Sequence, residues 1–267
     1  MIVGTVHSNR ANRRLGRGRA GYREAVRFEW VKYRTVRSTV WTTLALAAAL
    51  PALAVIVAVT GSLQPDDTVL GASVLGGAAA AQVLAAILGV LVVTGEFRTG
   101  MIRTTLTACP RRLVVLAAKA TVVGGVVFMA TLPSAAAAFG IGALLLDGDR
   151  YVTGEPFPAL LGVAVAIAAL GVLGVGIGTI VRHTAGAVGA AVAVVLVPGF
   201  AAPLFGSVQR WVGGASLGGV LQKLTQSSDA TYEAVGSLGA WPSLAVVAAY
   251  TVAIVAGAVW LLRIRDT

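Results

Sequence analysis

Residues 95–112 read GEFRTGMIRTTLTACPRR, a charged stretch between two long apolar runs. The run before it, 71–94, and the run after it, 120–146, contain no Asp, Glu, Lys, Arg or His. As an α-helix rising 1.5 Å per residue, each run can cross the roughly 30 Å hydrocarbon core of a membrane. The charged stretch is therefore predicted to be a water-exposed loop that joins two membrane spans.

The rest of the chain repeats this pattern. With 57% hydrophobic and 12% charged residues and a mean hydropathy of +0.85, it is far less charged than soluble domains, which carry roughly 25% charged residues. The predicted spans are 41–60, 71–94, 120–146, 159–181, 186–205 and 243–262. They are continuously apolar rather than alternating, which favours helices over barrel strands. The sequence therefore predicts an all-α integral membrane protein with six transmembrane helices.

Orientation is predicted from the basic residues. Most of the 21 Lys and Arg lie before residue 41, within 98–119, or after the last run. Because such residues accumulate on the cytoplasmic side, both termini and the 95–112 loop are expected to be cytoplasmic. The prediction is a multi-pass protein of the cytoplasmic (inner) membrane. Membrane topology explains the net charge of +10 better than nucleic-acid binding does, because the basic residues fall between apolar runs.

The N-terminal segment divides into two parts. Residues 1–21 are rich in Arg and Gly and are predicted to be a disordered basic cytoplasmic tail. Their GxGxxG pattern at 16–21 follows no strand, so a dinucleotide site is not expected. Residues 22–40 are rich in aromatic and basic residues and are predicted to be an interfacial elbow helix, with an ordinary basic juxtamembrane flank as the alternative. Val26, Trp30 and Tyr33 share one side of this helix, and Glu29 and Arg37 intrude on it.

The 95–112 loop has a pattern of its own. Met101–Ala108 can form about two helical turns with Ile102 and Leu106 on one side. Pro110 should end that helix because it lacks an amide proton. The next helix is expected to begin before the membrane, with Lys119 at the inner surface or snorkelling to it.

These residues resemble a known family. Glu96-Phe97-Arg98-Thr99-Gly100, followed by Leu106, Pro110 and Arg112, is similar to the cytoplasmic loop of type-2 ATP-binding-cassette (ABC) exporter permeases. Glu29-Trp30-Val31-Lys32-Tyr33-Arg34-Thr35 resembles the approach to the first span in actinobacterial members, and Leu261–Asp266 resembles their ending. Met101 stands where the wider family commonly has Thr.

The resemblance implies partners and a site. Two such subunits, identical or different, would work with two cytoplasmic ATPase subunits, which would hold ATP and Mg. Short re-entrant helices are expected in 206–240, before the last span. The residues expected to couple this chain to the ATPase subunit are Glu96, Phe97, Arg98, Thr99, Gly100, Met101, Ile102, Arg103, Leu106, Pro110, Arg111 and Arg112. Those expected to form the elbow helix contact are Glu29, Trp30, Lys32, Tyr33 and Arg34.

Missing motifs bear on function. No GxxxxGK[ST] loop is present, so the chain is expected to bind no ATP itself and not to be an enzyme. An ion-coupled transporter would keep a titratable group inside its spans, and the predicted spans have none. Ser216 lies in a GxSxG pattern, but both histidines are predicted on the other side of the membrane, and no metal-ligand spacing is present. A non-transporting scaffold or immunity-type subunit that binds partners stays as the alternative function.

Polar and small residues inside the spans indicate helix packing. Gly174 and Gly178 present a small-xxx-small face, which favours packing within one subunit over a dimer seam. Gln82 is expected to hydrogen-bond a neighbouring helix, with a cargo contact as the alternative. Since the spans are mostly Ala, Val, Leu and Gly, the expected cargo is apolar or amphiphilic and is exported.

Overall fold

A computed structural model describes residues 21–60, 67–101, 112–146 and 152–264, and this part of the chain is helical without strands. The long helices are α1 (Tyr22–Thr35), α2 (Arg37–Thr60), α3 (Val69–Thr99), α5 (Arg112–Leu145), α6 (Pro156–Val181), α7 (Thr184–Ala201) and α11 (Ala240–Ile264). The short ones are the 3-10 helix η1 (Ala202–Val208), α8 (Gln209–Ala215), α9 (Leu217–Leu224) and α10 (Tyr232–Val235).

Six helices in the described residues are long and apolar enough to cross a membrane, which confirms the predicted fold class of a six-span, all-α, multi-pass membrane protein. The helices extend beyond several predicted spans. α3 runs five residues past residue 94. α5 begins at Arg112, ahead of its apolar run, which agrees with the expectation that this helix starts before the membrane. The predictions stopped at the first charges, whereas a helix can continue into water while its residues still favour it. The predicted elbow segment 22–40 is shorter as a helix, because Val36 is extended (φ −86°, ψ 114°) and α2 begins at Arg37.

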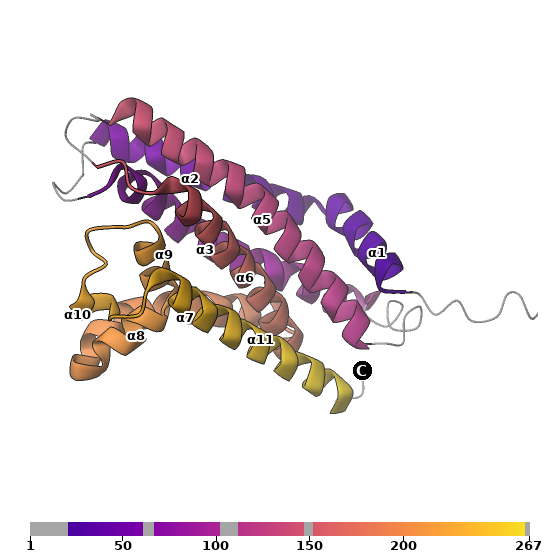
Figure 1. Cartoon of the computed structure of the whole chain (residues 1–267). Coiled ribbons are helices and arrows are strands. Elements are labelled where there is room, and N and C mark those ends of the chain that lie inside the picture. Colours follow the sequence, from indigo (N-terminus) through magenta and orange to yellow (C-terminus); the bar gives the residue numbers. More distant parts are fainter. Residues whose placement is uncertain (1–20, 61–66, 102–111, 147–151, 265–267) are drawn as a thin grey trace, which may run out of the picture.

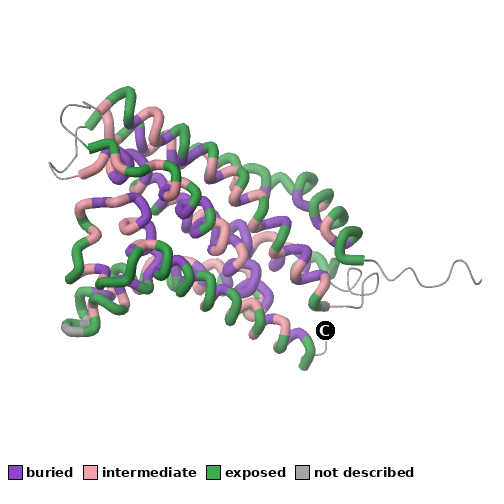
Figure 2. Tube along the Cα trace, in the orientation of Figure 1, coloured by how far each residue is buried: buried purple, intermediate pink, exposed green. Residues whose placement is uncertain are grey.

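α3 and α6 form the centre of the helix bundle (Figure 1). In the most apolar window of each, 56% of α3 and 67% of α6 are buried, against 17% for α2 and 22% for the windows that contain α7 and α11. α2 and α5 pack on one side of this central pair, and α11 packs on α6. Figure 2 shows the same division, with buried residues along the middle of the bundle and exposed ones on the outer helices. The outer helices therefore present the apolar surface that lipid would cover.

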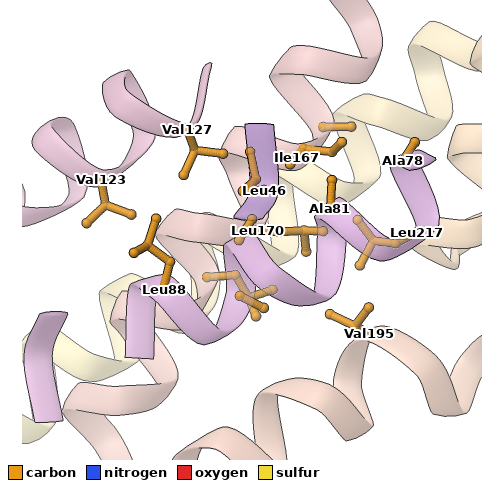
Figure 3. Close-up of a cluster of buried hydrophobic side chains, with 14 of the residues drawn as sticks. Leu46, Ala78, Ala81, Leu88, Val123, Val127, Ile167, Leu170, Val195 and Leu217 are labelled. Carbon is orange, nitrogen blue, oxygen red and sulfur yellow. The ribbon is translucent and has the colours of Figure 1, made fainter. Parts of the chain in front are cut away.

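The core is built from small and branched aliphatic side chains (Figure 3). Leu46 of α2, Leu88 of α3 and Leu170 of α6 are fully buried in one hydrophobic cluster, which also takes in Val123 and Val127 of α5. Close packing of such aliphatic side chains holds four helices together without any polar group among them.

Glycines set the distance between α3 and α6. A Cβ added to Gly174 would lie 2.1 Å from the carbonyl oxygen of Ala86, and one added to Gly178 would lie 3.2 Å from that of Val90. Gly89 of α3 meets Gly171 of α6 in the same way, at 2.0 Å. Gly174 and Gly178 therefore pack inside the chain, against α3. Such close backbone approach is the usual role of small residues between membrane helices.

Gln82 of α3 is buried among these helices. Its Oε1 accepts no hydrogen bond from the residues that the structure describes. The interhelical hydrogen bond expected from the sequence is therefore not made by this oxygen.

Four short helices, η1 and α8 to α10, lie between α7 and α11 at one end of the bundle (Figure 1). Ser216 caps α9: its hydroxyl donates to the carbonyl of Gly213 (2.6 Å) and accepts from the amide of Gly219 (3.0 Å). Its side chain is buried, and the glycines around it let α8, α9 and α10 touch, since a Cβ at Gly219 would lie 2.1 Å from the Gly213 carbonyl oxygen. The GxSxG pattern is thus a helix cap with close backbone packing.

Candidate functional site

Four charged side chains meet at the opposite end of the bundle from η1 and α8 to α10. They are Glu29 and Lys32 of α1, Glu96 of α3 and Lys119 of α5, and we call them the ion cluster. In Figure 1 this end holds α1, the start of α5 and the end of α11. Three helices that are far apart in the sequence are therefore joined here by charge.

The pairing in the ion cluster is reciprocal. Lys119 Nζ donates to Glu29 Oε2 at 2.7 Å and also to Glu96 Oε1. Lys32 Nζ donates to Glu29 Oε1 at 3.1 Å and also to Glu96 Oε1. Each ammonium thus bridges both carboxylates, and the two positive charges balance the two negative ones.

Burial gives these pairs their importance. The Lys119 side chain is 2% exposed, and those of Glu29 and Glu96 are nearly as buried, whereas Lys32 is 18% exposed. A buried charge without a partner costs several kcal/mol, so each member of the cluster depends on the others. Burial alone lowers the pKa of Lys32, but the charges and hydrogen bonds of Glu96 and Glu29 outweigh it, and the pKa lies above the ordinary 10.5. Lys32 is therefore charged at physiological pH.

Lys119 differs from the sequence analysis in one respect. Its side chain was expected at the inner surface or snorkelling to it, and among the described residues it is buried between helices rather than open to water. The reason is that two carboxylates from other helices reach it there, so the ammonium exchanges water for two anionic acceptors.

The elbow residues divide between the buried and exposed sides of α1. The buried face carries Ala25, Glu29 and Tyr33, four residues apart, so Glu29 lies at the centre of the side that faces the bundle. Trp30 is 44% exposed, and its ring lies parallel to that of Tyr33 with 6.4 Å between centroids. Glu29 faces inward because its partners are lysines of the bundle.

Two further contacts hold the elbow residues in place. Tyr33 makes a hydrogen bond between its hydroxyl and that of Thr43 in α2, which fixes the junction of the two helices. The Arg34 guanidinium lies over the Trp30 ring, 5.8 Å from its centroid.

The 95–112 segment begins as helix rather than loop. α3 continues to Thr99 and ends at Gly100, whose φ of 72° is the left-handed conformation common where helices stop. This helical continuation turns the Glu96 side chain into the bundle. Phe97 lies under the guanidinium of Arg182, 5.4 Å from the ring centroid.

Four of the other predicted coupling residues are exposed to solvent. Arg98, Thr99, Gly100 and Met101 are exposed at the end of α3, and Arg112 is the first residue of α5. The predicted coupling residues that lie outside the described residues are Ile102, Arg103, Leu106, Pro110 and Arg111.

A cavity of about 370 Å³ adjoins the ion cluster. It lies between α1, the start of α2, α3 and α5, and it reaches Thr184 at the start of α7. All four members of the ion cluster line it. The site therefore combines charged groups with a space of the size that small ligands occupy.

His183 has a local role. It precedes α7, and its Nδ1 accepts a hydrogen bond from the Gly186 amide at 3.3 Å. No group of three or more His, Cys, Asp and Glu side chains among the described residues is placed to hold a metal ion.

The ion cluster was missed in the sequence analysis although a signal was present. Lys119 is a lone charge in an otherwise apolar stretch, and Glu96 is the single acidic residue of the charged 95–112 segment. Isolated charges of opposite sign next to spans are candidates for pairing. The sequence did not show that Glu29 and Lys32 of α1 complete the ion cluster, because the position of α1 beside α3 and α5 is a tertiary contact.

The fold and this site define an α-helical multi-pass membrane protein in which buried ion pairs join α1, α3 and α5. No protein-family profile matches the sequence, and no curated protein matches it either.

Proposed function

We propose that the chain is the membrane-spanning permease subunit of an ATP-driven ABC exporter. Two such subunits, identical or different, would form the pathway, and cytoplasmic ATPase subunits that bind ATP and Mg would dock on the 95–112 segment. The proposal rests on the resemblance of Glu96–Gly100, Leu106, Pro110 and Arg112 to exporter permeases. The apolar lining expected between six such helices favours an apolar or amphiphilic cargo.

The ion cluster is compatible with this function. It joins the end of α3 and the first turns of α5 to α1 through side chains buried from water. The segment between α3 and α5 would receive the push of an ATPase subunit. With α1, α3 and α5 tied together, such a push would move them as one body instead of bending a single helix.

Glu96 takes a different role in this proposal from the one expected at first. Its side chain is buried and paired with Lys32 and Lys119, so in this conformation it is not available to a partner subunit. It would act as a positioning residue that fixes the end of α3. Contact with the partner would fall to the exposed Arg98, Thr99 and Met101 and to the segment that follows.

Replacing both Arg103 and Leu106 with Ala should abolish most of the ATPase stimulation that the chain gives to its partner. The measurement is ATP hydrolysis by a co-purified candidate ATPase in lipid nanodiscs, with and without the chain. The matched control replaces Arg263 and Ile264, an exposed basic and aliphatic pair at the end of α11, and should leave stimulation unchanged. Full stimulation by the Arg103/Leu106 variant would remove the coupling assignment.

The same assay separates the alternative function. A scaffold or immunity-type subunit would bind the partner but would not raise its rate of hydrolysis. Binding without stimulation by the unmodified chain would therefore favour that class over an exporter.

Orientation gives a second test of the proposal. With Cys109 replaced by Ser, a cysteine at Thr99 should react with a membrane-impermeant maleimide only after the cells are opened. A cysteine at Glu233, which is exposed at the other end of the bundle, should react in intact cells. The reverse pattern would put the 95–112 segment outside the cell, where no ATP-hydrolysing partner could reach it.

A further inference from the structure

The cavity beside the ion cluster is lined by charged side chains on one wall and by apolar side chains on another. Its apolar lining includes Val36 between α1 and α2, Leu91 and Val92 of α3, and Val122 of α5. The charged wall is the ion cluster, with Arg98 close by. A molecule that fits both walls must be amphiphilic.

One oxygen of the ion cluster lacks a partner. Glu96 Oε1 receives both lysine ammoniums, whereas Glu96 Oε2 is buried and accepts no hydrogen bond from the residues that the structure describes. A buried carboxylate oxygen without a donor costs about 1–3 kcal/mol. Since Glu96 lines the cavity, a donor held there lies next to this residue. An N–H or O–H group of a ligand would supply the hydrogen bond that Oε2 lacks.

The positive charges of the cavity specify the rest of that ligand. Lys32 keeps part of its side chain exposed, and Arg98 is exposed at the end of α3. Both line the cavity, and an ammonium or guanidinium binds phosphate well. A head group with a donor ammonium next to a phosphate matches the acceptor and the two cations together.

We propose that the cavity binds the head group and first acyl carbons of a phospholipid with a primary ammonium, such as phosphatidylethanolamine. The ammonium would donate to Glu96 Oε2, the phosphate would lie near Lys32 and Arg98, and the acyl chains would leave along Leu91 and Val92. The lipid would complete the ion cluster from the membrane side. This site does not depend on transport or on an ATPase partner, so it can stand or fall separately from the proposed function.

Phosphatidylethanolamine and phosphatidylcholine form a matched pair for the test. Both are zwitterions, but the trimethylammonium of phosphatidylcholine has no N–H to donate. For the full chain purified in detergent, native mass spectrometry with dioctanoyl lipids should show phosphatidylethanolamine binding at least about tenfold more tightly, the effect of one hydrogen bond to a charged acceptor. Equal binding of the two lipids would overturn the proposal.

A third ligand separates a phospholipid from a simple amphiphilic amine. Dodecylammonium carries the N–H donors and an alkyl chain but no phosphate. We expect it to bind more weakly than phosphatidylethanolamine, because Lys32 and Arg98 then have no anion to meet. Binding as tight as that of phosphatidylethanolamine would show that the phosphate plays no part and would overturn the phospholipid assignment.

A substitution that fills the cavity tests whether the lipid binds there. Gly95 lines the cavity, and a Cβ added there would meet no atom within 4 Å. Gly95→Leu should therefore extend a side chain from the lining of the cavity, and it replaces a helical glycine by a better helix former. The control is Gly125→Leu in α5, where an added Cβ also meets nothing and which does not line the cavity.

The two variants should differ only in lipid binding. We expect Gly95→Leu to lose the preference for phosphatidylethanolamine and Gly125→Leu to keep it, with similar unfolding midpoints for both proteins without added lipid. Unchanged binding by a folded Gly95→Leu protein would show that the lipid does not occupy this cavity.

Discussion

Replacing Lys119 with Met should destabilise the folded protein by about 3–5 kcal/mol, the usual cost of breaking a buried ion pair from one side. The substitution leaves Glu29 and Glu96 buried with only Lys32 between them. Methionine fills a similar volume, so lost packing adds little to the effect. The measurement is the free energy of unfolding in mixed micelles of mild detergent and SDS.

Two variants test whether charge is the cause. Lys32→Met should lower the free energy of unfolding by less than half as much. Lys32 is 18% exposed, so water can solvate the glutamates in place of part of its ammonium charge. Adding Glu29→Gln to Lys119→Met should recover stability, because one negative charge then remains for one positive charge. If the double variant loses as much stability as Glu29→Gln alone and Lys119→Met alone lose together, Glu29 and Lys119 are not coupled.

The ion cluster also shows what the sequence could and could not specify. Six apolar runs at membrane length predicted six helices, and the described residues contain them. This worked because hydrocarbon requires continuous apolar helix from each segment independently of its neighbours. The helix ends were less accurate, since α3 passes residue 94 and carries Glu96 into the bundle.

Pairing between helices was the part that sequence reasoning missed. The position of Lys119 was predicted from its neighbours in the sequence alone, and a lysine beside such an apolar run ordinarily snorkels to the membrane surface. Its burial depends on Glu29, which lies 90 residues away on α1. The inward direction of Glu29 in turn depends on how α1 packs against α5. No local pattern contains that information.

Close packing of α3 and α6 was better determined, because small residues act through their size alone. Gly174 and Gly178 were expected to pack within one chain, and they lie against Ala86 and Val90 of α3. The partner helix could not be named from the sequence, since several spans are rich in Ala and Gly.

Replacing Gly174 with Ala should destabilise the protein by about 1–3 kcal/mol or more, the range for overpacking a tight core. The new Cβ would lie 2.1 Å from the Ala86 carbonyl oxygen, which is backbone and cannot rotate away. α3 and α6 would have to separate, and both lie at the centre of the bundle. The same unfolding titration in mixed micelles measures the change.

Gly140→Ala is the control with the opposite sign. Gly140 lies in α5, and an added Cβ meets no atom within 4 Å. Alanine in a helix is favoured over glycine by roughly 0.5–1 kcal/mol, so this variant should be slightly more stable than the original. Gly174→Ala carries the same helix gain, so whatever it loses must come from the contact with α3. A neutral result at Gly174 would mean that α3 and α6 do not meet there, and the arrangement around the central pair would be wrong.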